Sequence, residues 1–460
     1  MTDRSIIEDP REFAAAYPDQ ALEHCRSAHP SDAAEFLSHL DDEEIWAILS
    51  RIEPLPTRSQ IFVQMPESMQ ADLAELLPRE ELSALVVEMP SDDRVDLLKR
   101  IPEDRRDLIM PAIAWAERED IRRLSAYKEG TAGSAMSSEY CTLSPFFTVE
   151  EAIRRLRVEA PNKETIYYAY VVDEERRLIG FVSLRDLILA RPQRKIEDIM
   201  NRDTIYSRVD DDQEEAARKI QKYDFIALPI IDRNDRLVGI ITHDDALDII
   251  TQEQTEDLEK LMAIQGTHES RAYLRTPVRV HFKNRVVWVM ILAVFGLISG
   301  YIIHSFEDVL EKFLILAIFI PMLADTGGNT GSQSATLVVR ALAINEITAR
   351  DILRVLWKEV RVAIPIGLVL SVVAFGRVLF FAGASEGIPE GFTVFNIGFA
   401  VSVALGLQVV SATLIGAILP LAAARAKLDP AVVASPALTT AVDITGLLIY
   451  FTTVKIMLGL

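Results

Sequence analysis

Asp443 lies inside a long apolar stretch near the carboxyl end of this 460-residue sequence. Thr439 and Thr440 precede it by about one helical turn, and Gly446 follows it. An ionised carboxylate at the centre of a bilayer costs about 3 kcal/mol on insertion scales, so it must face water or a partner. We therefore predict that Asp443 marks an ion path. The alternative is a structural carboxylate that pairs with a threonine or an arginine.

A second polar stretch, TGGNTGSQSAT, follows Asp325 in another apolar segment. Pro321 removes a helical hydrogen bond, and glycines allow backbones to approach closely. The glycines and amides of the stretch are Gly327, Gly328, Gly331, Asn329 and Gln333. This composition predicts non-helical polar backbone, which is tolerated at membrane depth only where protein buries it or where it lines water. The stretch is thus a helix-packing seam or a pore wall, and Asp443 favours the pore wall.

The side chains of Asp443, Asn329 and Thr439, with backbone carbonyls, offer hard oxygen ligands. The apolar part of the chain has neither cysteine nor two histidines at ligand spacing. Oxygen ligation favours Mg²⁺ or Ca²⁺ over Zn²⁺ or Cu⁺. Ca²⁺ takes about six to eight oxygens, whereas Mg²⁺ keeps several waters and needs one or two carboxylates. One aspartate per chain therefore favours Mg²⁺, and a symmetric pair of chains would bring two such aspartates to a shared axis.

Acidic side chains gather at three places in the first 260 residues. One face of a short helix carries Asp92, Asp93 and Asp96. The ends of a helix over residues 213–223 carry Asp212, Glu214 and Asp224. The segment after residue 243 carries Asp245, Asp248, Glu253, Glu256 and Asp257. Because like charges that meet across interfaces repel, bridging Mg²⁺ would favour a compact form, and we predict a cytosolic Mg²⁺ sensor here. Solvated surface acids are the alternative.

The charges divide the chain into two parts. The formal net charge of −20 falls almost wholly on residues 1–275, because acidic and basic residues nearly balance in residues 276–460. An acidic head repels nucleic acid and suits a binder of cations. Cys25 and Cys141 are the two cysteines, so neither a disulfide framework nor a thiolate metal site is indicated. The first residues lack the apolar core of a signal peptide, so we expect the head to stay in the cytoplasm.

Five apolar segments after residue 279 are long enough to cross a membrane as helices. We expect them at about 286–306, 309–343, 357–382, 393–424 and 431–458. Basic residues precede the first segment and fill alternate loops, which predicts a multi-pass protein of the inner membrane with its amino terminus inside and its carboxyl terminus outside. The head opens with short, proline-punctuated amphipathic segments, which predict stacked helices over residues 1–130.

Residues 133–250 contain an internal repeat at an offset of 59. In it Asp173 aligns with Asp232, Gly180 with Gly239, Ser183 with Thr242 and Asp186 with Asp245. Each copy predicts strand, turn, strand and helix, with a further helix upstream at 149–159 or 213–223. The pattern resembles the tandem CBS modules, which bind small ligands and often dimerise. The resemblance implies that Ser183, Asp186 and Thr242 contact the ribose of ATP or another adenine nucleotide.

Two motifs extend the resemblance to the whole chain. The first, P-x5-GGN-x-G-x-Q, begins at Pro321, and the second, DPA-x4-P-x6-D-x2-G, begins at Asp429. With the helical head and the CBS pair they resemble the MgtE magnesium channel/transporter family. One departure is Ser435, where a characterised relative has Asn. The resemblance implies a homodimeric Mg²⁺-selective pore at the subunit interface with Asp443 as its ion-site carboxylate, and a head that binds Mg²⁺ and closes the pore when Mg²⁺ is plentiful.

The fold class we expect is therefore multi-domain and largely α-helical, with one α/β part. The expected parts are a helical N-terminal domain at 1–130, two CBS modules at 131–192 and 193–250, an amphipathic connecting helix at 251–278, and a five-span pore domain at 279–460. The connecting helix is either a passive linker or a mechanical lever. An ion-coupled secondary transporter of divalent cations is the alternative function. An intramembrane metalloprotease is disfavoured because the seven histidines form no HExxH, and we expect no enzyme activity.

Overall fold

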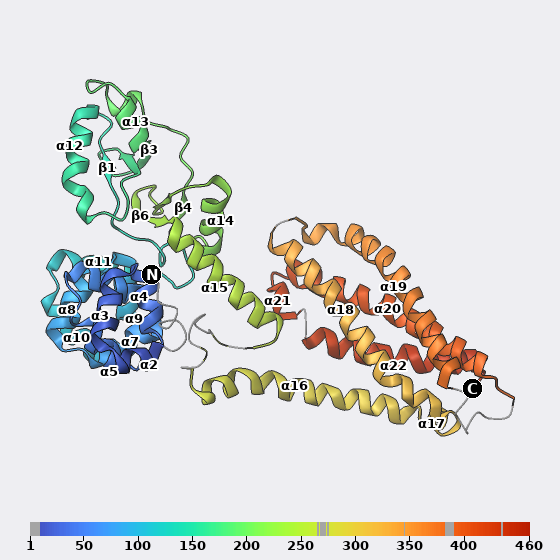
Figure 1. Cartoon of the computed structure of the whole chain (residues 1–460). Coiled ribbons are helices and arrows are strands. Elements are labelled where there is room, and N and C mark those ends of the chain that lie inside the picture. Colours follow the sequence, from blue (N-terminus) through green and yellow to red (C-terminus); the bar gives the residue numbers. More distant parts are fainter. Residues whose placement is uncertain are drawn as a thin grey trace. The chain divides into compact units, whose positions relative to one another are not determined.

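The computed structural model describes residues 10–264, 266, 273, 276–344, 346–381, 391–433 and 436–460. The chain forms two compact units (Figure 1). The first comprises Met1–Gln254 with Glu269–Tyr273, and the second comprises Thr255–His268 with Leu274–Leu460.

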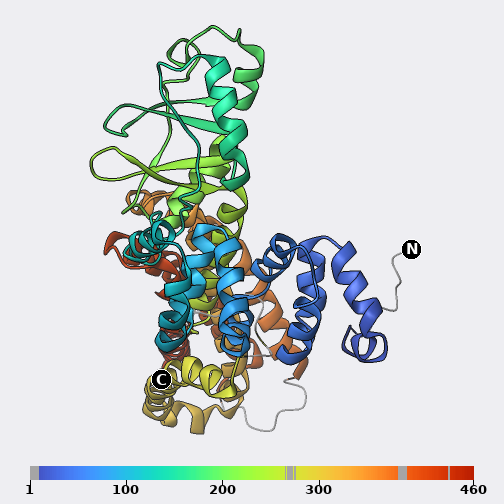
Figure 2. The ribbon, with the colours of Figure 1, turned by 90° about the vertical axis from the view of Figure 1, so that its left-hand side faces the viewer.

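Short helices follow one another through the first part of the first unit (Figure 2). They are α2 (Pro10–Ala16), α3 (Pro18–Ser27), α4 (Pro30–Leu37), α5 (Asp42–Leu49), α6 (Leu55–Val63), α7 (Glu67–Leu76), α8 (Arg79–Glu88), α9 (Ser91–Arg100), α10 (Glu103–Ile109), η1 (Met110–Ala112) and α11 (Trp115–Ser125). Most begin at or just after a proline, which lies in the first turn of α3 and at the N-cap of α7, α8 and α9. Its missing N–H costs nothing at these positions, because the first N–H groups of a helix have no partner within it. The prediction of stacked short helices is confirmed.

Buried arginines join successive helices of this array. Arg94 in α9 is almost fully buried, and its guanidinium donates to the Val86 and Met89 carbonyls at 2.8 and 2.7 Å. Arg58 in α6 donates in the same way to the Ile52 and Ser50 carbonyls at 3.1 and 2.7 Å. Carbonyls at helix ends lack partners within their own helix, so a cation there satisfies them and complements the helix dipole.

Two copies of one α/β module complete the first unit. The first contains β1 (Thr142–Leu143), α12 (Val149–Glu159), η2 (Ala160–Asn162), β2 (Tyr168–Val172), β3 (Leu178–Ser183), α13 (Leu184–Leu189) and η3 (Ile196–Asp198). The second contains β4 (Ser207–Arg208), α14 (Gln213–Tyr223), β5 (Ala227–Ile231), β6 (Leu237–Thr242) and α15 (His243–Leu261). From Thr255 on, α15 belongs to the second unit. In each, the short first strand pairs parallel with the second strand, which forms an antiparallel hairpin with the third.

The two hairpins confirm the repeat and meet at their turns. Their strand bounds differ by the offset of 59 found in the sequence. The Leu178 N–H donates to the Asp235 carbonyl at 3.1 Å, and the Leu237 N–H donates to the Arg176 carbonyl at 3.0 Å. Arg176 and Asp235 occupy equivalent turn positions with φ of 65° and 60°. The reciprocal bonds therefore pair the modules about a local two-fold axis.

The connecting helix differs from its prediction. A separate helix over 251–278 is wrong, because α15 runs without a break from the second module to Leu261, and a new helix begins only at Val278. Neither glycine nor proline occurs in residues 243–261. The sequence therefore gives no signal that would end the helix of the second module at residue 250, where the predicted boundary lies. Part of the predicted helix, at 265, 267–272 and 274–275, lies outside the described residues.

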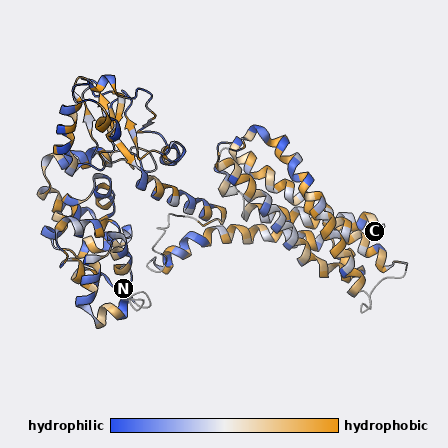
Figure 3. Ribbon diagram, turned by 45° about the horizontal axis from the view of Figure 1, so that its top comes forward, coloured by the Kyte–Doolittle hydropathy of each residue, from blue (hydrophilic) through white to orange (hydrophobic). Residues whose placement is uncertain are grey.

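The described residues of the second unit include five helical segments long and apolar enough to span a membrane, as predicted (Figure 3). Its elements are α16 (Val278–Ser305), α17 (Glu307–Lys312), η4 (Leu314–Phe319), α18 (Ile320–Ala343), η5 (Ala349–Asp351), α19 (Ile352–Phe381), α20 (Val394–Arg425), α21 (Pro430–Val433) and α22 (Pro436–Leu458). The α20 helix is the centre of the bundle, since α18, α19 and α22 all pack against it.

Two expectations about the spans are wrong. The second span does not run unbroken from Val309, because α17 and η4 precede α18. The stretch after Pro321 is helical, because this proline occupies the first turn of α18, where its missing N–H leaves no hydrogen bond unmade. Glycines of that stretch serve helix packing instead. A Cβ placed on Gly416 of α20 would come under 3.0 Å from the Gly331 carbonyl oxygen of α18.

Candidate functional site

Asp443 lies in α22 with its side chain partly buried. Among the described residues it makes neither a hydrogen bond nor an ion pair. A structural aspartate in an apolar span would need such a partner to offset the cost of its charge. The geometry therefore favours a carboxylate that meets water or a cation.

The polar residues of α18 form one stripe that the rest of the second unit leaves exposed. Pro321, Asp325 and Asn329 follow one another at intervals of four, and each is exposed. The Asn329 amide donates from Nδ2 to Asp325 Oδ1 at 3.1 Å. A Cβ on Gly328 would lie 3.7 Å from Thr439 Cγ2, so α18 and α22 are adjacent beside the stripe. An amide and a carboxylate cannot face lipid at low cost, so this stripe calls for water or a second chain.

Gln408 is a residue of this region that sequence reasoning missed. Its side chain is fully buried in α20, and Nε2 donates to the Val442 carbonyl in α22 at 3.2 Å. The signal available in the sequence was an amide near the middle of a largely apolar span.

Lys260 was also missed, and it ties the end of α15 to the second motif. Its ammonium lies 2.8 Å from Glu256 Oε1 and 3.0 Å from Asp429 Oδ2. Partial burial lowers the pKa of Lys260, because it disfavours the charged ammonium. The hydrogen bonds to Glu256 and Asp429 have the larger combined effect, so the lysine pKa is raised overall. The neighbouring Leu261 packs on an apolar cluster that includes Val339 of α18 and residues of α20 and α22.

The first unit brings several of the predicted sensor acids together. Burial, and then the charge of Asp245, raise the pKa of both Asp92 and Asp93 well above the usual range. Oδ1 of Asp92 is buried without a hydrogen-bond partner among the described residues. Burial raises the pKa of Asp245 to about 6, although hydrogen bonds from Thr242 oppose this shift. These carboxylates thus share a site that disfavours their ionised forms.

Glu164, which the sequence analysis did not single out, completes this acidic cluster of Asp92, Asp93, Glu164 and Asp245. Burial, followed by the charges of Asp245, Glu139 and Asp244, raises its pKa to about 7. No three Asp, Glu, His or Cys side chains converge on one point suited to a metal ion in the part of the chain that the structure describes.

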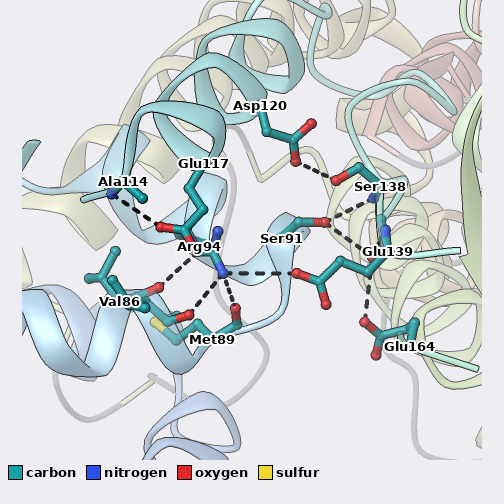
Figure 4. A network of polar contacts seen from close by, with 12 residues as sticks. Val86, Met89, Ser91, Arg94, Ala114, Glu117, Asp120, Ser138, Glu139 and Glu164 are labelled. Atoms are coloured by element: carbon teal, nitrogen blue, oxygen red, sulfur yellow. Dashed lines mark hydrogen bonds and ion pairs between the residues drawn. The ribbon is translucent and has the colours of Figure 1, made fainter. Parts of the chain in front are cut away.

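Hydrogen bonds around Ser91, which begins α9, hold the cluster in place (Figure 4). The Ser138 N–H donates to Ser91 Oγ at 2.9 Å, and the Ser137 hydroxyl donates to Glu164 Oε2 at 3.4 Å. Arg94 lies 3.9 Å from Glu139. These contacts link the helical array to the start of the first α/β module, so the acids meet at the junction of two domains.

Other predicted sensor residues have local partners instead. Asp96 pairs with Lys99 at 3.3 Å, and Asp212 caps α14 by accepting the Glu214 N–H at 2.8 Å. The remaining partners are Arg218 for Glu214, Gln213 for Glu253 and Lys260 for Glu256. Asp224 ends α14 with φ of 53°. Asp248 contributes to the raised pKa of Asp245, and Asp257 lies on the same helix, α15.

The predicted nucleotide residues cap helices. The Ser183 hydroxyl donates to Asp186 Oδ2 at 2.6 Å and accepts the Asp186 N–H, at the start of α13. Before α15 the Thr242 hydroxyl likewise donates to Asp245 Oδ2, and here the Thr242 N–H donates to the same oxygen at 3.2 Å. An open cavity of about 580 Å³ lies elsewhere in this unit, and Arg123, Arg155, Lys163 and Arg176 are among its lining residues. None of the predicted nucleotide residues lines it. Ser435 lies outside the described residues.

Comparisons with known proteins match the helical array, both α/β modules and most of the apolar spans. Family models match residues 320–453 (MgtE, divalent cation transporter), 28–130 (MgtE intracellular N domain), and 132–192 and 196–252 (CBS domain). The magnesium transporter MgtE of Thermus thermophilus is 43% identical over 353 residues, which cover 77% of this chain and 75% of that protein. The magnesium transporter MgtE of Bacillus subtilis is 37% identical, over 73% of this chain and 71% of that protein.

A solved structure is also similar to the first part of the chain. It is the crystal structure of the cytosolic domain of the Mg²⁺ channel MgtE in complex with ATP. Its sequence is 36% identical, and the match covers 52% of this chain and 98% of that chain with a TM-score of 0.49.

Proposed function

Because the chain belongs to the MgtE family of magnesium transporters, which are not enzymes, we propose that it is a Mg²⁺-selective channel whose opening is controlled by Mg²⁺ in the cytoplasm. It acts as a homodimer in the inner membrane, with its amino terminus inside and its carboxyl terminus outside. Its work is Mg²⁺ uptake and homeostasis.

The observation that carries the ion path is the unpaired Asp443 beside the exposed polar stripe of α18. Mg²⁺ dehydrates reluctantly, so a hydrated ion can be held by a carboxylate through retained water. Asn329 and Thr439 add neutral oxygens, and Asp325 adds a second charge on the stripe. A second chain would cover the stripe and supply a second Asp443, which removes the cost of exposing these groups to lipid.

The acidic cluster supports a sensor of internal Mg²⁺. Burying four carboxylates at one domain junction is unfavourable while they are ionised, as the raised pKa values show. A divalent cation near them offsets that repulsion, whether it binds one carboxylate directly or bridges several through water. High Mg²⁺ therefore favours the compact head, and low Mg²⁺ favours separation of its domains.

The helix α15 offers a route from sensor to pore. Asp245 of the acidic cluster lies in its first turn, within the first unit, whereas Lys260 near its end lies within the second unit and pairs there with Asp429. A continuous helix transmits displacement of one end to the other. We assign α15 the role of a mechanical lever rather than a passive linker.

A nucleotide site is a second proposal for the CBS pair. Ser183, Asp186 and Thr242 sit at equivalent helix starts in the two modules, where a bound ribose or phosphate would replace the hydrogen bonds that they make to one another and to Asp245. Binding of ATP to the purified protein, lost in Asp186→Ala, would support it. Equal binding by that variant would contradict it.

The central experiment is Asp443→Ala in cells that lack other Mg²⁺ importers. We expect uptake to collapse while the protein still reaches the membrane. Normal uptake in this variant would remove Asp443 from the mechanism. Single-channel recording of the purified chain in bilayers then separates the two transport modes, because unitary current steps indicate a channel and their absence with retained uptake indicates the ion-coupled transporter.

A further inference from the structure

Gln408 holds an uncommon position among the described polar residues of the membrane spans. It lies near the middle of α20, its side chain is 0% exposed, and its amide crosses to α22. Its Oε1 is buried without a hydrogen-bond partner among the described residues. A buried amide in an apolar span costs free energy that one hydrogen bond offsets only in part. Apolar residues would fill this space at lower cost, so packing alone does not account for a glutamine here.

Two glycines leave room for this one side chain. A Cβ on Gly327 of α18, or on Gly446 of α22, would come under 3.0 Å from Gln408 Nε2. Gly446 lies one turn after Val442, whose carbonyl accepts the amide. Three helices therefore meet at Gln408, and two of them lack side chains where its amide passes.

The carbonyl that Gln408 contacts belongs to the peptide bond between Val442 and Asp443. This carbonyl also accepts the Thr445 hydroxyl at 3.2 Å. A rotation or a shift of α22 by one residue would break the bond from Gln408 and drive a side chain into its amide. The Val442 side chain is buried, while the next side chain, Asp443, is only partly buried.

We propose that Gln408 is a positioning residue for the ion path: it fixes the rotation of α22 so that the Asp443 carboxylate keeps one orientation toward the ion. The proposal rests on the function assigned above to Asp443. It deepens that function, because a fixed carboxylate discriminates between hydrated ions of different size, whereas a mobile carboxylate adapts to each.

The test compares Gln408→Met with Ser402→Ala in proteoliposomes of the purified full chain. Methionine keeps the length of glutamine and removes its amide. Ser402 is the matched control, since it is buried in the same helix and its hydroxyl bonds only the Gly398 carbonyl of that helix, at 2.7 Å. The readouts are the Mg²⁺ concentration at half-maximal influx, the ratio of Mg²⁺ to Ca²⁺ influx, and the melting temperature.

We expect Gln408→Met to lower the ratio of Mg²⁺ to Ca²⁺ influx about fivefold or more, with a melting temperature close to that of Ser402→Ala. An unchanged ratio and an unchanged half-maximal concentration would overturn the proposal. If Gln408→Met does not assemble, Gln408→Asn supplies the answer, because it keeps the amide but its shorter side chain withdraws the amide from Val442. Its ratio should fall likewise, and a ratio equal to that of the unmodified chain would overturn the proposal.

Asp443→Asn, measured in parallel, separates this inference from the proposed function. If Asp443→Asn transports Mg²⁺ normally, the ion site itself is wrongly assigned. If Asp443→Asn is inactive and Gln408→Met is indistinguishable from the unmodified chain, the ion site stands and only the positioning role of Gln408 falls.

Discussion

The Nζ atom of Lys260 lies 3.0 Å from Oδ2 of Asp429, so that the end of α15 is joined by an ion pair to the residue that precedes α21. Asp429 also accepts the Ala431 N–H at 2.9 Å and thereby caps α21. One carboxylate thus serves both the start of α21 and the end of the helix that continues from the second CBS module. This contact therefore fixes the end of α15 to the start of α21 within the second unit.

Lys260→Ala should weaken closure of the pore. The two side chains are about one third exposed, at 29% and 36%, so solvent screens the pair and its worth is about 0.5–1 kcal/mol. The Mg²⁺ concentration that half-inhibits current should rise about two- to fivefold. Patch recording with controlled internal Mg²⁺ measures it. In Lys260→Arg, which keeps the charge, the half-inhibiting Mg²⁺ concentration should stay near that of the unmodified chain. A rise equal to that of Lys260→Ala would show that the ion pair with Asp429 does not contribute to closure.

Glu164→Gln should favour the compact head at lower Mg²⁺, because it removes one of the charges that repel one another in the acidic cluster. Limited proteolysis of the purified chain across a Mg²⁺ titration reports the change as protection that begins at lower concentration. Glu150→Gln, on the exposed face of α12 with Arg154 as its partner, is the matched control. Protection midpoints that agree between both variants would show that Glu164 has no part in sensing.

The head should respond to pH when divalent cations are absent. The pKa of Glu164 is raised from 4.5 to about 7, and that of Asp245 from 3.8 to about 6. A carboxyl group whose pKa is raised in the compact form stabilises that form below its unperturbed pKa, and this contribution is lost as pH rises through the raised value. In chelator, protection from proteolysis should therefore decline between about pH 4 and pH 7. Saturating Mg²⁺ should abolish the decline. A decline that persists in Mg²⁺ would show that the pH response does not arise from the carboxylates that respond to Mg²⁺.

Gly416→Ala should destabilise the pore domain. The added Cβ would collide with the Gly331 carbonyl of α18, and such overpacking costs about 1–3 kcal/mol. Gly376→Ala is the control, because no atom lies within 4 Å of a Cβ at that position. Thermal unfolding in detergent should show a lower melting temperature for the first variant only. Equal melting temperatures would mean that α18 and α20 can separate without cost.

Much of the architecture follows from the sequence because it is written in local patterns. The CBS hairpins follow from a repeat at an offset of 59, and the five spans follow from apolar length. The helices over 149–159 and 213–223 have the bounds expected of them. Where expectation failed, a local signal had two meanings. Pro321 can break a helix or begin one. It begins α18 here, because the short helix η4 ends at Phe319 and Pro321 falls in the first turn of the next helix.

The sequence alone also singled out Asp443, because a carboxylate within a long apolar segment is costly in a membrane. That cost depends on the residue type and the span length, and both can be read from the sequence. Only the tertiary structure decided which residues surround the functional groups. Gln408 and Val442 are 34 positions apart, and Lys260 meets Asp429 from a different part of the chain. Glu164 joins Asp92 and Asp245 only because two domains pack there. Such contacts arise from the burial of apolar surface elsewhere, which fixes the elements in place and carries these polar side chains along with them.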